Sequence, residues 1–267
     1  MGANTLAAQE QAGLRFAEAK GAKSIADLRR MSGTELMAPV SGGARFGVVL
    51  DGYVQPLSAG EMFAQGKQND VPTLTGSNLN DLGGASTHST TTAEQFQKQA
   101  GQRYRDLASS FLNLYPAATD EQAQASANAS ALDSMRVSTY LWAIDRAKTA
   151  KTKTYTYFWD HALPGPDAAQ YGAFHTGEVP YVMNTLNMCQ GRDFTDADRQ
   201  IADRMSSYWA NFIRTGDPNG KGLPRWPSSA EKPGTTMELG DKNAPIAVAG
   251  SREKLDLFEK ILRSPAP

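Results

Sequence analysis

The sequence predicts an α/β fold that is rich in helix and has few sheet strands. Two short runs, 71–75 and 154–159, are rich in β-branched and aromatic residues, as strands are. Apolar residues recur at helical spacing before, between and after these two runs. The order is therefore strand, loop, two helices, strand, loop and helix, which is typical of a sheet covered by helices.

The first ninety residues are expected to form helices, a strand and a loop. An opening helix ends at Gly21, and Ser24 caps a short second helix. Residues 46–54 alternate apolar, aromatic and glycine positions and are expected to be extended. The strand at 71–75 then leads into a polar, glycine-rich loop at 76–86. We treat 1–90 as the first part of one domain.

Residues 91–150 are expected to form a helical excursion between the two strands. In 92–114 the apolar residues recur at three- and four-residue steps, and Pro116 stops the run. A second helix is expected over 120–149. Aromatic residues of this segment, such as Phe111, fit a gorge entrance or the core, and the core is the more common place for them.

Residues 151–267 complete the expected single domain of 1–267. A long helix is predicted from Asp196 to Arg214, with Thr195 as its N-cap and Gly216 just after its end. Residues 236–239 are expected to add a short strand. A final amphipathic helix follows Ser251.

Composition excludes several classes of function. The formal net charge is −1 and 40 % of the residues are apolar, so the chain can bury a core but has no basic surface for nucleic acid. No stretch has the length and apolarity of a membrane span. Cys189 is the single cysteine, which rules out a disulfide within the chain, and the spacing of the histidines suggests no zinc site.

Three histidines, His88, His161 and His175, are the candidates for proton transfer at neutral pH. His175 lies in a glycine-flanked loop beyond the strand at 154–159, and loops beyond the carboxyl ends of strands are where α/β sheets place their active sites. A loop histidine without chemistry remains the plainer alternative from spacing alone.

Asp81 is the one carboxylate of the loop at 76–86, which follows the other strand. A carboxylate beside a catalytic histidine fixes its tautomer and stabilises the imidazolium that forms. A turn aspartate that bonds its own backbone is the alternative. The chain order of Asp81 before His175 is compatible with the last two members of a serine, acid and histidine triad.

Four motifs then resemble those of type-B carboxylesterases, the family that includes cholinesterases and para-nitrobenzyl esterases. Gly-Ala-Phe-His-Thr-Gly-Glu-Val-Pro-Tyr-Val at 172–182 resembles the histidine motif of that family. Trp-Ala-Asn-Phe-Ile-Arg-Thr-Gly-Asp-Pro-Asn at 209–219, followed by Trp-Pro, resembles a later helix end. Residues 50–56 resemble the segment before the acid strand, and 71–83 resemble the acid loop. The four occur in family order over nearly the whole chain.

This resemblance implies a partial α/β-hydrolase, the C-terminal half of a carboxylic ester hydrolase. His175 is implied as the general base and Asp81 as the acid, where the family usually has glutamate. The shorter side chain, and Leu82 after it, depart from the family pattern. Glu178 is expected to begin a helix and Tyr181 to pack beneath the site. The substrate is implied to be a small carboxylic ester, and a serine triad needs no cofactor.

The nucleophile is not in this sequence. Ser58 and Ser86 come nearest to Gly-x-Ser-x-Gly, but each lacks one glycine, and there is no His-Gly-Gly-Gly stretch for an oxyanion hole. We therefore expect the chain to be a fragment whose partner is the N-terminal half of the esterase. The surfaces left uncovered predict poor solubility or dimerisation of the chain expressed alone.

Two other functions remain open: an inactive esterase-like binding module, and a truncated remnant. The N-terminal residues do not resemble a signal peptide. The family resemblance favours a secreted or periplasmic location, with a cytoplasmic one also open.

Overall fold

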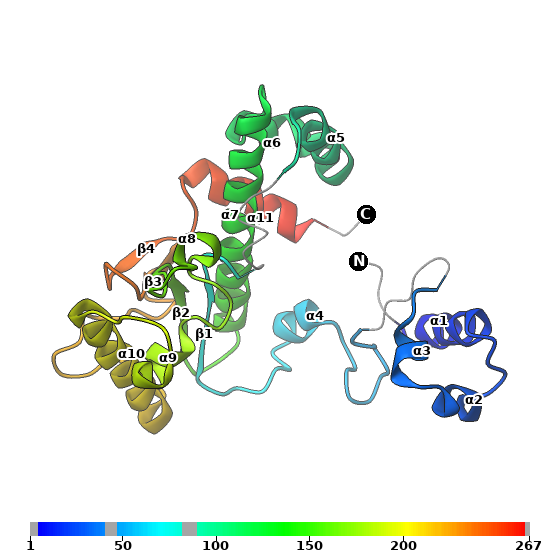
Figure 1. Cartoon of the computed structure of the whole chain (residues 1–267), viewed down its shortest axis with the longest axis horizontal. Coiled ribbons are helices and arrows are strands. Elements are labelled where there is room, and N and C mark those ends of the chain that lie inside the picture. Colours follow the sequence, from blue (N-terminus) through cyan, green and yellow to red (C-terminus); the bar gives the residue numbers. More distant parts are fainter. Residues whose placement is uncertain (1–4, 41–46, 82–89, 265–267) are drawn as a thin grey trace. The chain divides into compact units, whose positions relative to one another are not determined.

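The computed structural model describes residues 5–40, 47–81 and 90–264 (Figure 1). The chain divides into two compact units, one that runs to Lys67 and one from Gln68 to Ser264. The organisation of residues 1–267 as one domain stays a prediction.

The first unit contains four short helices: α1 (Leu6–Ala19), α2 (Ile25–Arg30), α3 (Gly33–Met37) and α4 (Ala59–Ala64). Each begins at a serine or threonine whose hydroxyl accepts a backbone N–H of the first turn, as N-caps do. The two helices predicted on either side of Gly21 are therefore confirmed. Among the described residues of this unit, Ala22 is the one buried apolar residue.

The extended segment predicted at 46–54 is wrong for its described part, 47–54. Asp51 Oδ1 accepts the backbone N–H groups of Tyr53 and Gln55, each at 2.9 Å, and Gly52, directly after Asp51, takes a φ of +76°. The side chain of Asp51 thus binds backbone donors that a strand would offer to a neighbouring strand. What remains of strand pairing is an isolated bridge between Leu50 and Thr5.

The second unit is built on a mixed sheet in the order β1-β2-β3-β4. β1 (Thr73–Asn78) pairs in parallel with β2 (Thr154–Trp159), and β2 pairs in parallel with β3 (Thr235–Glu238). β4 (Pro245–Ala247) closes the sheet as an antiparallel edge strand. The three predicted strands are confirmed with small shifts, and β4 was not anticipated.

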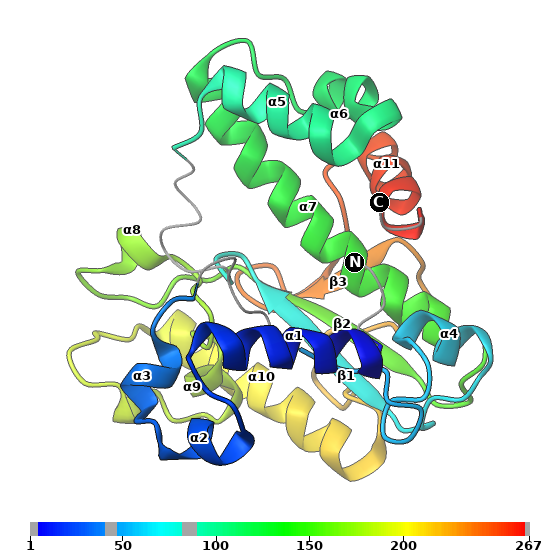
Figure 2. The ribbon, with the colours of Figure 1, turned by 90° about the vertical axis from the view of Figure 1, so that its right-hand side faces the viewer.

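Helices cover both faces of this sheet, as Figure 2 shows for α7 (Asp120–Ala147) and α10 (Asp196–Thr215). Alternate residues of β2 point to opposite faces. Tyr155 and Tyr157 make ring contacts with α10, whereas the ring of Phe158 lies under an arginine of α7. β2 is accordingly buried on both faces, as inner parallel strands are.

The helical excursion is confirmed, with one break. α5 (Ala93–Tyr104), the short η2 (Arg105–Leu107) and α6 (Ala108–Leu114) replace the continuous helix predicted over 92–114. Arg105 takes a φ of +47°, which ends α5. Phe111 lies in a buried apolar cluster formed by α5, α6, α7 and α11 (Arg252–Arg263), so its core interpretation is confirmed.

A second buried apolar cluster lies under the loops that follow β2. It joins β2 to α10 and to two short elements, α9 (Val179–Val182) and η3 (Leu186–Met188). The short α8 (Ala168–Tyr171) precedes them in the same stretch of chain. The predicted ends of α10 are confirmed, because the hydroxyl of Thr195 accepts the N–H of Asp198 and Gly216 takes a left-handed conformation. The loops that position the candidate site rest on this cluster.

Candidate functional site

The acid loop, described here for residues 79–81, begins where β1 ends. Leu79 N–H still donates to Trp159 O at 2.8 Å, so the backbone leaves the sheet beside the end of β2. The chain then turns back, and Asp81 Oδ2 accepts the N–H of Asn78 at 2.8 Å. This turn uses one carboxylate oxygen of Asp81 and leaves Oδ1 for another partner. Leu82 and His88 lie outside the described residues.

The histidine loop, residues 160–178, follows β2 and approaches the acid loop. Gly172 takes a φ of +57°, and Thr176 takes a φ of +72° just after His175. These two left-handed residues turn the backbone sharply on either side of the histidine. The imidazole is thereby presented at the surface, with 73 % of the side chain exposed.

The structure brings the two predicted site residues together. His175 Nδ1 lies 2.9 Å from Asp81 Oδ1, although 94 residues separate them in the sequence. The hydrogen bond that His175 donates to Asp81, and then the charge of Asp81, raise the pKa of His175 above the ordinary value, with Glu178 adding to the effect. Within the described residues no group hydrogen bonds to Nε2 of His175, so this nitrogen can meet a molecule from solution.

The structure confirms the expected positions of Glu178 and Tyr181. Glu178 is the N-cap residue of α9, and its carboxylate accepts from the side chain of Asn78 and shares a hydrogen bond with Tyr157. Tyr181 is fully buried beneath the loop and donates to Asp198 at 2.7 Å. Both residues therefore fix the loop from below.

His161 forms a different cluster with carboxylates. Its Nδ1 lies 2.8 Å from Asp241 Oδ1, and its Nε2 lies 2.9 Å from Asp198 Oδ1. Burial alone would raise the pKa of Asp198, but hydrogen bonds from Thr195, Tyr181 and His161 outweigh it and lower the pKa to about 2. Because both ring nitrogens are occupied, His161 is suited to holding the loop in place.

An acidic pair, the buried Glu238 and the half-buried Asp160, lies nearby at the ends of β3 and β2. Glu238 is fully buried, and its Oε2 accepts the N–H groups of Lys242 and Asn243. A Cβ on Gly240 would lie 2.6 Å from Asp160 Oδ1 and 2.7 Å from Glu238 Oε1, so these two oxygens are close neighbours. Burial, and then the neighbouring Asp160, raise the pKa of Glu238 to about 7. Sequence reasoning gave no sign of this pair.

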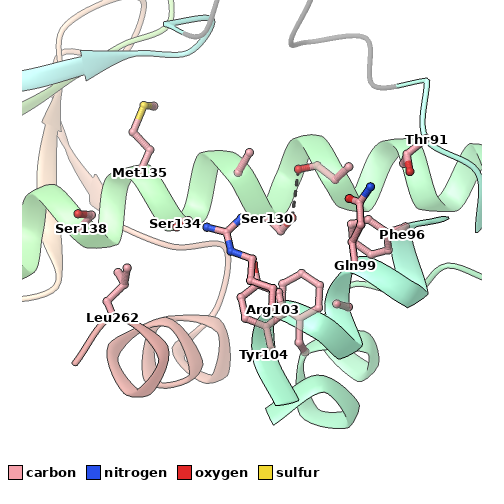
Figure 3. A pocket seen from close by; sticks show the side chains of 14 residues that line it. Thr91, Phe96, Gln99, Arg103, Tyr104, Ser130, Ser134, Met135, Ser138 and Leu262 are labelled. Atoms are coloured by element: carbon pink, nitrogen blue, oxygen red, sulfur yellow. Dashed lines mark hydrogen bonds between the residues drawn. The ribbon is translucent and has the colours of Figure 1, made fainter. Parts of the chain in front are cut away.

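A cavity of about 470 Å³ lies away from the two loops, between α5, α7 and α11 (Figure 3). Its walls come from aromatic and polar side chains of α5, including Phe96, Gln99, Arg103 and Tyr104, and from small residues of α7. Neither His175 nor Asp81 lines it. The cavity is therefore separate from the site formed by His175 and Asp81.

Other ligand sites find little support in the part of the chain that the structure describes. There is no group of three or more histidine, cysteine and acidic side chains arranged to hold a metal ion. Each helix of that part is too short or too polar to cross a lipid bilayer.

Comparison with known proteins defines the class. The solved structure of Aspergillus niger EstA matches 97 % of this chain with a TM-score of 0.68 at 17 % identity, and a para-nitrobenzyl (PNB) esterase matches 96 % with a TM-score of 0.64 at 20 % identity. The fold is thus that of the α/β-hydrolase esterases. The sequence profile of the carboxylesterase family matches residues 6–258, and the chain belongs to that family.

Individual relatives match different shares of the chain. The human protein named cocaine esterase is 27 % identical over 67 % of this chain. A rat acylcarnitine hydrolase is 46 % identical over 21 % of it, and a phenmedipham hydrolase of Pseudarthrobacter oxydans is 31 % identical over 40 %.

The matched regions are only part of each relative. They cover 35 % of the human protein, 10 % of the rat protein and 22 % of the bacterial one. The chain spans 56 % of EstA and 55 % of the PNB esterase. The chain thus spans a little over half the length of its solved relatives, and the matches span 35 % or less of these curated relatives.

Proposed function

We propose that this chain supplies the general base and its acid partner to a serine-type carboxylic ester hydrolase. His175 is the proposed base and Asp81 the proposed acid. The observation that carries the proposal is the 2.9 Å contact between His175 Nδ1 and Asp81 Oδ1, combined with an exposed imidazole whose Nε2 faces outward from that contact.

The arrangement suits proton transfer at Nε2. A carboxylate at Nδ1 holds the proton on that nitrogen, so the lone pair of neutral imidazole lies on Nε2. Nε2 can then take the proton of a serine hydroxyl as the oxygen attacks an ester carbonyl, and can return it to the departing alcohol. The Asp81 carboxylate stabilises the imidazolium between these two steps.

The serine and the oxyanion donors are proposed to come from outside these 267 residues. The sequence contains neither Gly-x-Ser-x-Gly nor His-Gly-Gly-Gly. The partner we propose is the nucleophile-bearing half of the same type of esterase. Without it, the terms that dominate acyl transfer are missing, so the chain alone is expected to be inactive.

The test is hydrolysis of para-nitrophenyl acetate by this chain together with a nucleophile-bearing half, beside His175→Ala. The variant should lose roughly 10³-fold or more of the rate, because the base is gone. His161→Gln is the matched control: it changes a histidine of the same loop that lies between two other carboxylates, and glutamine keeps a hydrogen-bonding side chain there, so the rate should fall far less than in His175→Ala. Full activity of His175→Ala would overturn the assignment.

An esterase-like binding module, or an inactive remnant, is the alternative. It rests on the same absence of a nucleophile within the sequence. If combination with a nucleophile-bearing half yields a stable complex but no hydrolysis, the binding module is the better description.

A further inference from the structure

The acid and histidine loops are joined by hydrogen bonds other than the His175–Asp81 contact. Asn80 N–H donates to Ala173 O at 3.0 Å, and Ala173 N–H donates back to Asn80 Oδ1 at 2.8 Å. Asn78 Nδ2 donates to Phe174 O at 2.8 Å. Asn78, at the end of β1, and Asn80, in the acid loop, therefore hold the two residues that precede His175 in the histidine loop.

Burial differs sharply between these bonds and the pair they support. Asn78 and Asn80 are 2 % and 7 % exposed, whereas the side chain of His175 is 73 % exposed. Solvent screens an exposed histidine–carboxylate contact, so this contact alone does little to fix the relative position of the two side chains. Buried hydrogen bonds to backbone groups are costly to lose and therefore fix the loops more firmly.

Two further contacts show that the acid and histidine loops fit together at specific residues. Asn78 also donates its own N–H to Asp81 Oδ2 at 2.8 Å, which turns Oδ1 toward the imidazole. A Cβ at Gly172 would collide with Asn80 Oδ1, so the close approach needs glycine at that position. The same asparagines thus constrain the carboxylate on one side and the histidine backbone on the other.

We propose that Asn78 and Asn80 are positioning residues, which hold the histidine loop on the acid loop and thereby direct the Nδ1–H of His175 to Asp81. This positioning role rests on the proposed function in one respect: it explains how the His175–Asp81 pair keeps the geometry that catalysis would need. An amide carries no charge, so Asn80 cannot replace Asp81 as the acid. Its contribution is instead an acceptor for a backbone N–H.

The test follows the imidazole of His175 by nitrogen-15 and proton NMR in the 267-residue chain, without any ester. The wild-type chain should show a low-field Nδ1 proton and a raised pKa for His175, with Asp81 and Glu178 as the carboxyl groups that act on it. Asn78→Ala and Asn80→Ala should lose the low-field proton and lower the pKa of His175. Asn80→Asp retains the acceptor and should keep the low-field proton.

Asn219→Ala is the matched control. Asn219 holds Trp226 by the same kind of paired bonds, with Oδ1 accepting from Trp226 N–H at 2.7 Å and Nδ2 donating to Trp226 O at 2.9 Å. This variant should lower the unfolding midpoint without changing the His175 signals. If the Asn78 and Asn80 variants lose stability in the same way and keep the His175 signals, the positioning role is wrong.

A wild-type chain without the low-field proton would also overturn the proposal. Ester hydrolysis plays no part in these measurements. A failed hydrolysis assay beside intact NMR results would therefore reject the proposed function and leave the positioning role standing.

Discussion

At His175 the two ring nitrogens have different surroundings, and this difference sets what the side chain can do. Nδ1 is held by Asp81, and the side chain is mostly exposed. His161 lies in the same loop, but carboxylates hold both of its nitrogens. A base needs one nitrogen fixed and one available, and of these two histidines His175 alone meets that condition.

We expect Asp81→Asn to lower the rate of ester hydrolysis by roughly 10³–10⁴-fold in the combined enzyme, because the amide no longer fixes the tautomer. The base works as neutral imidazole, so activity rises with pH through the pKa of His175. Asp81 raises that pKa, and the variant should therefore shift the acid limb of the pH profile to lower pH.

Asp241→Asn is the control for this prediction, because it makes the same change beside His161. It should keep both the rate and the pH profile. A pH profile of Asp81→Asn that coincides with that of the wild type would contradict the role of Asp81.

Glu238 should make folding stability depend on pH. Its pKa is about 7 in the folded chain, against 4.5 for an ordinary glutamate carboxyl. Between these values the unfolded carboxyl loses its proton while the folded one keeps it, so this contribution to stability falls as pH rises from 4.5 to about 7. Glu238→Gln should remove the fall, which urea unfolding at several pH values would measure.

Glu259→Gln is the matched control on the surface of α11, where the carboxylate pairs with Arg263 at 3.0 Å. It should keep the pH dependence of the wild type. If Glu238→Gln showed the same pH dependence of stability as the wild type, Glu238 would not titrate as described.

For single residues, the sequence was enough to name His175 and Asp81 as a pair. It did not reveal the side chains that hold this pair in place. His175 and Asp81 follow strands in a recognisable order, and motif and spacing were enough. Asn78, Asn80 and the Asp160–Glu238 pair depend on contacts between loops far apart in the chain. A local pattern contains no signal for such contacts, and asparagine in a glycine-rich loop is otherwise an ordinary turn residue.

Among the elements, α7 is tied to the start of two strands by one side chain. Arg146, 2 % exposed, donates to Thr154 Oγ1 at 2.9 Å and to Thr152 O at 3.2 Å, and it also reaches Val71 O. Asp70 accepts from the Thr152 hydroxyl and from the N–H groups of Lys151 and Thr152, which lowers its pKa to about 2. The strands that lead to both loops are thus anchored together at their amino ends.

Arg146→Met should lower the free energy of unfolding by about 3 kcal/mol, because the buried oxygens around it lose their donor. Urea unfolding followed by circular dichroism measures the change. Arg103→Met, on an exposed position of α5, should change stability by less than about 0.5 kcal/mol. A loss of similar size in both variants would argue against the anchoring role of Arg146.

Elements with local end signals were predictable, and elements fixed by distant partners were not. The caps at Thr195 and Gly216 set the ends of α10 through bonds within a few residues. β4 is a three-residue strand that exists because β3 lies beside it, and no periodicity marks it. The expected strand at 46–54 failed because a single aspartate, Asp51, turned the chain.

Over the whole molecule, the buried apolar residues are divided unequally between the two units. Both buried clusters lie in the unit from Gln68 to Ser264. In the described part of the other unit, large apolar side chains such as Met37 and Tyr53 are 84 % and 89 % exposed. Such exposure is consistent with the expectation of poor solubility or self-association, which stays a prediction.

Deleting residues 1–67 should leave a chain that still unfolds cooperatively, because both apolar clusters remain. The separate 1–67 peptide should unfold gradually, since its described part buries little apolar surface. Thermal melts of the two pieces by circular dichroism test this. A broad, gradual melt of the 68–267 piece would show that its core needs the first unit.

The cross-loop bonds of Asn78 and Asn80 also bear on how quickly a two-piece enzyme could be reconstituted. Because the proposed base and its acid partner already meet within one polypeptide, we expect no slow refolding of that polypeptide to precede turnover. The lag before product appears should then shorten in proportion to the concentration of the complementing piece, as in a simple bimolecular encounter.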